Sequence, residues 1–143
     1  MLAKYFIPVG LIIGSIVTSS LCQAAGTETG RYITRERIVK SGKQTNVTAF
    51  NQVNPDCSAG RLPNIKIVSG PAHGKLILSR EQLNPKFNSG DERHKCNSRK
   101  LPMTVLLYTS DTGFSGVDAI RVVAKGVIDD NYQFLNLRLK VTK

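Results

Sequence analysis

The sequence predicts an all-β protein, a two-sheet sandwich of about seven short strands. Short apolar runs alternate with polar residues and are separated by clusters of Gly, Pro, Asn and Asp. Aromatic residues make up 6% of the chain and Trp is absent, so the core depends mainly on Val, Ile and Leu. The β-branched members of that set favour strands over helices. A chain of 143 residues holds one domain of this kind.

The first 24 residues have the pattern of a secretory signal peptide, which we expect to be helical. Lys4 provides the basic start, Phe6 to Val17 is largely apolar, and Cys22-Gln23-Ala24 offers small residues at a cleavage position. We expect cleavage after Ala24, or after the neighbouring Ala25. The mature domain would then span residues 25–143.

Two other fates of this leader stay open. It could be retained as an anchor, although its apolar stretch is shorter than the roughly 20 residues that a spanning helix needs. It could also be lipidated at Cys22, where Ser19 and Leu21 match a bacterial lipoprotein signal imperfectly. Either fate would place the protein at a membrane through its leader alone.

The predicted strands that follow the leader are short and separated by clear turns. Tyr32 to Lys40 alternates imperfectly, as an edge strand does. Thr45 to Phe50 forms a second strand, with Val47 and Ala49 on its inward face. We expect Asn64 to Ser69 to be half-buried and Lys75 to Ser79 to follow a tight turn.

The strands of the second half carry the strongest patterns. Met103 to Tyr108 is apolar on both faces, which predicts a central strand covered on two sides. Val117 to Ala124 follows a corner and places Ile120 and Val122 inward. Leu135 to Val141 alternates apolar and polar residues without a break, so it predicts a final antiparallel strand.

The cysteine count predicts one disulfide. Three Cys are present, and removal of the leader leaves Cys57 and Cys96 as an even pair in an oxidising compartment. Closing a loop of about 39 residues would contribute roughly 4 kcal/mol on the chain-entropy model. The alternative, a thiol or metal site that uses His94, lacks ligands because the chain has two His and no Cys-x-x-Cys. We therefore expect no metal and no cofactor.

A basic loop between Arg80 and Pro102 is the candidate contact surface. Lys and Arg number 20 against 10 Asp and Glu, so the formal net charge of +10 favours anionic partners. A disulfide at Cys96 would hold the cations of this loop near one another and reduce the entropy lost on binding. The alternative is an exposed loop whose charges only solvate it. Nucleic acid is disfavoured because Phe87 is the loop's one aromatic residue. The candidate anion-binding residues are Arg93, His94, Lys95, Arg99 and Lys100.

Other residues that could carry chemistry are better explained by turns. His73 lies between Pro71-Ala72 and Gly74, and no Ser, Cys or carboxylate pair stands at a spacing suited to proton transfer. Asp111 and Asp118 offer too few oxygens nearby for calcium. We expect Asp118 to accept backbone hydrogen bonds in the corner before its strand.

Two short motifs resemble bacterial immunoglobulin-like and cadherin-like surface modules. Pro71-Ala72-His73-Gly74-Lys75-Leu76 resembles Pro-x-His-Gly-x-Leu, and Tyr108 to Asp118 resembles Tyr-x-x-x-x-Gly-Phe-x-Gly-x-Asp. The resemblance implies an immunoglobulin-like sandwich and an exported bacterial location, but no activity. Ser110 stands where such modules often have Pro, Ala119-Ile120 replaces an aromatic, and the Cys pair is not general among them. The signature positions act as turn formers: Pro71, His73, Gly74, Gly113, Phe114, Gly116 and Asp118.

These observations predict an exported, non-enzymatic binding or structural module of the cell envelope or periplasm. Its basic loop would contact an anionic envelope polymer or an acidic protein surface. The alternative is a small secreted enzyme inhibitor or hydrolase that acts through the same loop. A hydrolase would need a cleft that joins a His to a nucleophile or carboxylate, and the sequence offers no such grouping.

Overall fold

The computed structural model describes residues 30–127 and 131–143, and over these residues the chain is built from strands. The predicted leader, residues 1–24, lies outside the described residues, and so does its Cys22. One short 3-10 turn is the described helical element, and no helix in this part of the chain is long and apolar enough to span a bilayer. The elements are β1 (Gly30–Lys40), β2 (Thr45–Phe50), β3 (Asn64–Ser69), β4 (Gly74–Leu83), η1 (Glu92–Ser98), β5 (Leu101–Ser110), β6 (Gly116–Lys125) and β7 (Tyr132–Thr142).

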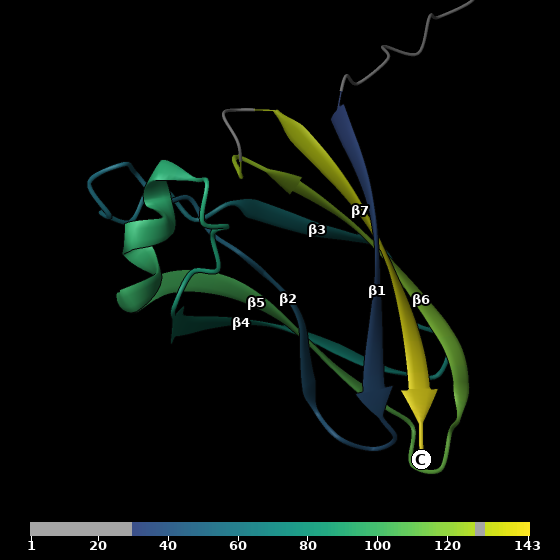
Figure 1. The fold of residues 1–143 in the computed structure, drawn as a ribbon. Coiled ribbons are helices and arrows are strands. Elements are labelled where there is room, and N and C mark those ends of the chain that lie inside the picture. Colours follow the sequence, from purple (N-terminus) through teal and green to yellow (C-terminus); the bar gives the residue numbers. More distant parts are fainter. Residues whose placement is uncertain (1–29, 128–130) are drawn as a thin grey trace, which may run out of the picture.

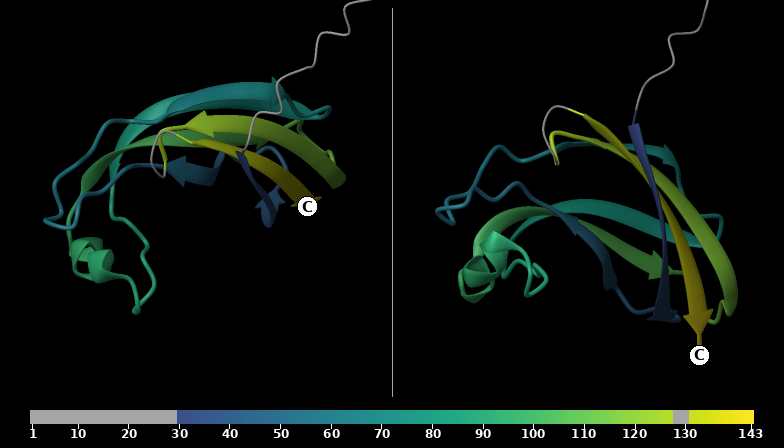
Figure 2. Two further views of the ribbon diagram at one scale, coloured as in Figure 1. Left: turned by 90° about the horizontal axis from the view of Figure 1, so that it is seen from above. Right: turned by 45° about the horizontal axis from the view of Figure 1, so that its top comes forward.

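The strands form two sheets that pack face to face (Figures 1 and 2). One sheet has the order β1-β7-β6-β3 and the other has the order β2-β5-β4. β1 pairs with β7 in parallel, whereas every other described pairing is antiparallel. The predicted all-β, two-sheet class is therefore confirmed.

The core lies between the sheets and is supplied mainly by β5, β6 and β7. β5 is the central strand of its sheet, and Val105, Leu106 and Tyr108 on it are fully buried. Ile120 and Val122 of β6 point inward, as predicted, because the alternation of a strand places every second residue on one face. The strict alternation in β7 likewise buries Leu135, Leu137, Leu139 and Val141.

Two expectations for the middle of the chain were wrong in detail. β3 is not half-buried, because it is an edge strand and only Ile65 is partly covered, while the rest of β3 is exposed. β4 is longer than Lys75 to Ser79, because it pairs with β5 along its whole length up to Leu83 opposite Leu101. The irregular segment therefore begins after β4, at residue 84, rather than at Arg80.

A bulge in β2 changes which of its side chains enter the core. The pairing of β2 with β5 shifts register between Asn46 and Thr48. An extra residue in one strand reverses the faces that follow it. Val47 and Phe50 therefore lie in the core, whereas Ala49, expected beside Val47, is only half-buried.

Candidate anion-binding groove

The predicted disulfide between Cys57 and Cys96 is confirmed, with the two Cα atoms 5.2 Å apart. It joins the loop after β2 to η1 and so anchors residues 84–100, which we call the flap. Cys96 is fully buried in a small second core with Val53 and Leu101, and Phe87 packs against it. Figures 1 and 2 show η1 at the end of the sandwich away from the C-terminus.

The flap holds one arginine in a fixed orientation. Asp91 caps η1 by accepting the backbone N–H of Arg93 at 2.9 Å, and it also accepts the guanidinium through Nε at 2.9 Å and Nη2 at 2.7 Å. These hydrogen bonds lower the pKa of Asp91 to about 2 and raise the pKa of Arg93. The guanidinium also lies over the Phe87 ring, 4.5 Å from its centroid. Asn97 in turn holds the Phe87 backbone with two hydrogen bonds of 2.9 Å.

The other predicted flap cations are arranged differently from Arg93. His94, Lys95, Arg99 and Lys100 are exposed on η1 or directly after it, and none forms an ion pair with a described residue. Arg93 is half-buried and lines a hollow to which those four residues do not contribute. Of the five predicted anion-binding residues on the flap, only Arg93 lines this hollow.

Strand β1 brings further arginines to the same place. Its odd-numbered residues share one face, and Val39 on that face is only 3% exposed. That face is therefore the inward one, so Arg31, Arg35 and Arg37 also face the second sheet. Charged side chains on the inward face of an edge strand are one of the ways in which proteins manage exposed sheet edges.

These residues line two adjoining hollows between β1, β2 and the flap, which we call the cationic groove. One hollow measures about 250 Å³ and the other about 670 Å³. They share five lining residues and therefore adjoin, and no described carboxylate side chain lines either one. The shared residues are Arg35, Thr48, Ala49, Asn51 and Phe87, and the lining cations are Arg31, Arg35, Arg37, Lys86 and Arg93.

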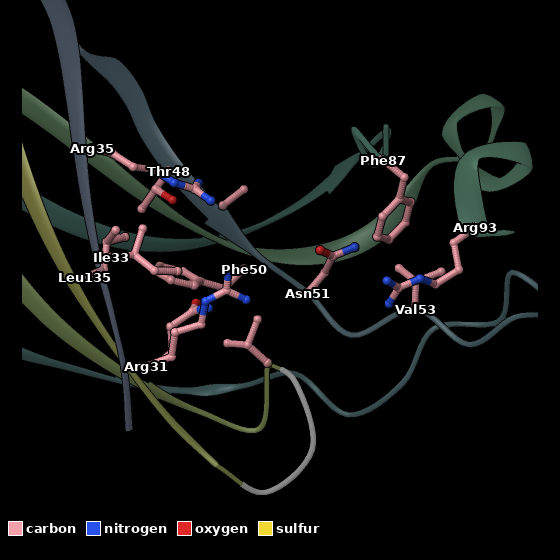
Figure 3. Close-up of a pocket in the computed structure, with 13 residues that line it drawn as sticks. Arg31, Ile33, Arg35, Thr48, Phe50, Asn51, Val53, Phe87, Arg93 and Leu135 are labelled. Carbon is pink, nitrogen blue, oxygen red and sulfur yellow. The ribbon is translucent and has the colours of Figure 1, made fainter. Parts of the chain in front are cut away.

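Asn51 places an unused hydrogen-bond donor in this groove. Its Nδ2 atom is buried and has no hydrogen-bond partner among the described residues. Figure 3 shows Asn51 between the β1 side, with Arg31 and Arg35, and the flap side, with Phe87 and Arg93. Ile33, Phe50, Val53 and Leu135 add apolar surface to the smaller hollow. A ligand here would meet cations and an amide donor above an apolar floor.

The residues at the opposite end of the sandwich have structural contacts. The exposed His73 stacks on Phe114 with ring centroids 4.2 Å apart, and its backbone N–H donates to Asp118 at 2.9 Å. Neither imidazole makes a side-chain hydrogen bond to a described residue. Within residues 30–127 and 131–143, no group of three or more His, Cys, Asp or Glu side chains could hold a metal.

Comparison with known proteins gives one weak structural likeness. No protein-family profile and no curated protein matches the chain. Among solved structures, the solution structure of amebosin is similar with a TM-score of 0.40 and 12% sequence identity. That match covers 80% of this chain and 99% of amebosin. The chain itself defines an all-β, disulfide-bonded protein with a cationic groove at one end.

Proposed function

We propose that this protein is an exported, non-enzymatic binding module of the bacterial cell envelope or periplasm, which binds an anionic partner in the cationic groove. The observation that carries the proposal is the lining of the groove, which includes five cationic side chains and no described carboxylate. Arginine suits this role because its planar guanidinium donates paired hydrogen bonds to carboxylate or phosphate.

An immunoglobulin-like classification is supported by the division of the strands. In such sandwiches the second, fifth and fourth strands share one sheet, and the third, sixth and seventh share the other. β2-β5-β4 and β6, β7 with β3 follow this division, and β1 lies beside β7. The signature residues Tyr108 and Asp118 meet in one corner, with Tyr108 Oη 3.0 Å from Asp118 Oδ2. The disulfide is consistent with an oxidising compartment outside the cytoplasm.

The groove cations differ in whether they already form an ion pair, and this difference supports different roles for them. Arg93 is already paired with Asp91, so its charge is partly neutralised and its main effect is to shape the wall. Arg31, Arg35, Arg37 and Lys86 are exposed and form no ion pair with a described residue, so an anion would be their first charged partner. The flap cations His94, Lys95, Arg99 and Lys100 lie outside the groove and would mainly steer an anionic partner toward it.

The test compares three variants that each lose three positive charges. The groove variant carries Arg31→Gln, Arg35→Gln and Arg37→Gln, and the flap variant carries Lys95→Gln, Arg99→Gln and Lys100→Gln. A matched control carries Lys66→Gln, Arg121→Gln and Lys125→Gln, which are exposed on the β3–β6 side. Binding to short poly-L-glutamate is measured by calorimetry across a salt series.

We expect the groove variant to lose about tenfold or more in affinity, which corresponds to about 1.4 kcal/mol. The flap variant should mainly slow association, and the control should bind nearly as the unmodified protein does. Binding should weaken steadily as salt rises. An equal loss in all three variants would mean that net charge alone attracts the polymer, and the groove would then have no special role.

A further inference from the structure

We propose that the cationic groove receives an extended acidic peptide segment, which adds as a strand to the open edge of β1. This inference rests on the proposed anion-binding function and names the class of partner. Strand addition to an exposed sheet edge is a general mode of peptide recognition, in which main-chain hydrogen bonds give affinity and alternate side chains give specificity.

The backbone of β1 is available for such pairing. β1 is 11 residues long, and among the described residues only β7 pairs with it. The N–H of Ser41 donates to Thr142 O at 2.8 Å, and Val39 O accepts from Thr142 Oγ1 at 3.4 Å. The polar groups of odd-numbered residues therefore face β7, and alternation places those of Thr34 and Glu36 on the open edge. There Glu36 O accepts a hydrogen bond from Arg37 Nη1 at 3.0 Å, an exposed contact that an added strand would have to displace. Figure 1 shows β1 at the margin of its sheet.

The inward side chains of β1 favour acidic residues in the added strand. In an extended strand, residues i and i+2 lie on the same face about 7 Å apart. Arg35 and Arg37 therefore have the same spacing as the same-face side chains of an extended peptide. Opposite charges on adjacent strands stabilise their pairing. Arg31 lies two such intervals from Arg35, so three acidic side chains would find partners.

The outward side chains of β1 favour apolar residues at the alternate positions. Tyr32 and Ile38 are 72% and 73% exposed although both are large apolar side chains. Tyr32 stacks on Phe134 of β7, with ring centroids 4.7 Å apart, which holds its ring in place. An added strand would cover these side chains with its own outward residues. The preferred segment therefore alternates acidic and apolar residues.

The same features disfavour two other occupants. A second copy of β1 would set arginines beside arginines, and like charges on adjacent strands are destabilising. A polyanionic saccharide could reach the cations, but it has no peptide backbone to continue the hydrogen-bond ladder. An alternating acidic and apolar peptide can pair with the open edge of β1, neutralise its arginines and cover its apolar outer face at the same time.

The experiment compares three blocked peptides of about eight residues, a common strand length, on the oxidised protein. The first alternates Glu and Val, the second has the same composition in the order Glu-Glu-Val-Val, and the third is the alternating peptide with N-methylated valines. We expect the alternating peptide to bind about tenfold tighter than either of the others. The variant Thr34→Pro, which removes one N–H from the open edge, should weaken it similarly while remaining folded by its amide NMR spectrum.

The controls separate this inference from the proposed function. If all three peptides bind equally while poly-L-glutamate still depends on the groove arginines, strand addition is wrong and anion binding stands. If poly-L-glutamate binding does not depend on those arginines, both proposals fail. Tighter binding of polygalacturonate than of the alternating peptide would identify a saccharide partner and overturn the inference.

Discussion

The phenol oxygen of Tyr108 lies 3.0 Å from Oδ2 of Asp118, and both side chains are buried. The same carboxylate accepts the backbone N–H groups of Ala72, His73 and Ala119 at 2.8, 2.9 and 3.0 Å. Burial, followed by the bond to the Asp118 carboxylate, raises the pKa of Tyr108 above its usual range. This pair ties β5, β6 and the turn before β4 together at the end of the sandwich opposite the flap.

The first prediction is that stability falls in acid through Asp118. Burial alone would raise its pKa, but the three backbone hydrogen bonds and the Tyr108 hydroxyl outweigh burial and lower it. A carboxyl with a lowered native pKa stabilises the fold fully above its unfolded value of about 3.9, and that contribution is lost as pH falls through the native pKa. Asp118→Asn should therefore lose about 1–3 kcal/mol near neutral pH, because buried donors lose an acceptor.

Urea unfolding of Asp118→Asn and the unmodified protein across pH measures this effect. The difference between the two should shrink as pH falls below about 4, where the carboxyl of the unfolded state begins to protonate, and it should reach its minimum below the lower native pKa. Asp111→Asn is the control, since Asp111 is exposed in the same corner. If the difference in unfolding free energy does not change with pH, the negative charge of Asp118 does not contribute to stability.

The second prediction concerns the disulfide, which closes a loop with a sequence separation of 39. The double variant Cys57→Ala with Cys96→Ala should lose roughly 4 kcal/mol of unfolding free energy, mainly because its unfolded chain is less restricted. Amide hydrogen exchange in the flap should rise as well, because the second core loses its cross-link. An unchanged free energy of unfolding would contradict this account.

The third prediction contrasts two glycines that flank the turn before β4. A Cβ atom on Gly74 would lie 2.5 Å from Thr109 O and 2.7 Å from Tyr108 Cε2, whereas a Cβ on Gly70 would meet no atom within 4 Å. Gly74→Ala should therefore cost about 1–3 kcal/mol through overpacking. Gly70→Ala should be neutral or slightly stabilising, because Ala restricts the unfolded chain. Thermal unfolding of both variants tests the contrast, and similar melting temperatures would refute it.

Residues with a strong local pattern could be predicted from the sequence. The final strand could be predicted from the local alternation of Leu135 to Val141, and the structure confirms it. The disulfide could be predicted by counting cysteines, and Cys57 and Cys96 are indeed bonded. The pairing of β1 with β7 could not be predicted, because parallel partners far apart in sequence leave no local signal. The bulge in β2 was missed for the same reason, since it depends on its partner β5.

The groove was missed although β1 contains a signal for it. Ile33 and Val39 both occupy odd positions, and that spacing places Arg31, Arg35 and Arg37 on the same inward face. Charges on an edge strand ordinarily indicate solvent exposure, so the arginines of β1 by themselves predicted no site. Of the five predicted anion-binding residues of the loop, the structure brings only Arg93 to the groove. The pattern that predicts such a groove is a set of arginines that alternate along a strand in step with its inward-facing apolar residues.

The fourth prediction is that Asn51 lowers stability in the free protein and contributes to binding. Its Nδ2 atom is buried without a described partner, and an unpaired buried donor costs about 1–3 kcal/mol. Asn51→Leu keeps a similar size and removes that donor, so the free energy of unfolding should rise by about 1 kcal/mol. The same variant should bind poly-L-glutamate more weakly, because the groove loses a donor near Arg35.

Stability and binding should therefore change in opposite directions at this one position, as in a trade-off between stability and function. Urea unfolding and calorimetric titration of the same preparation give both quantities. Thr45→Val is the control, because Thr45 lies at the other end of β2 and lines neither hollow. If Asn51→Leu loses stability, the amide has a partner in the free protein. If it gains stability but binds poly-L-glutamate unchanged, anions do not reach this part of the groove.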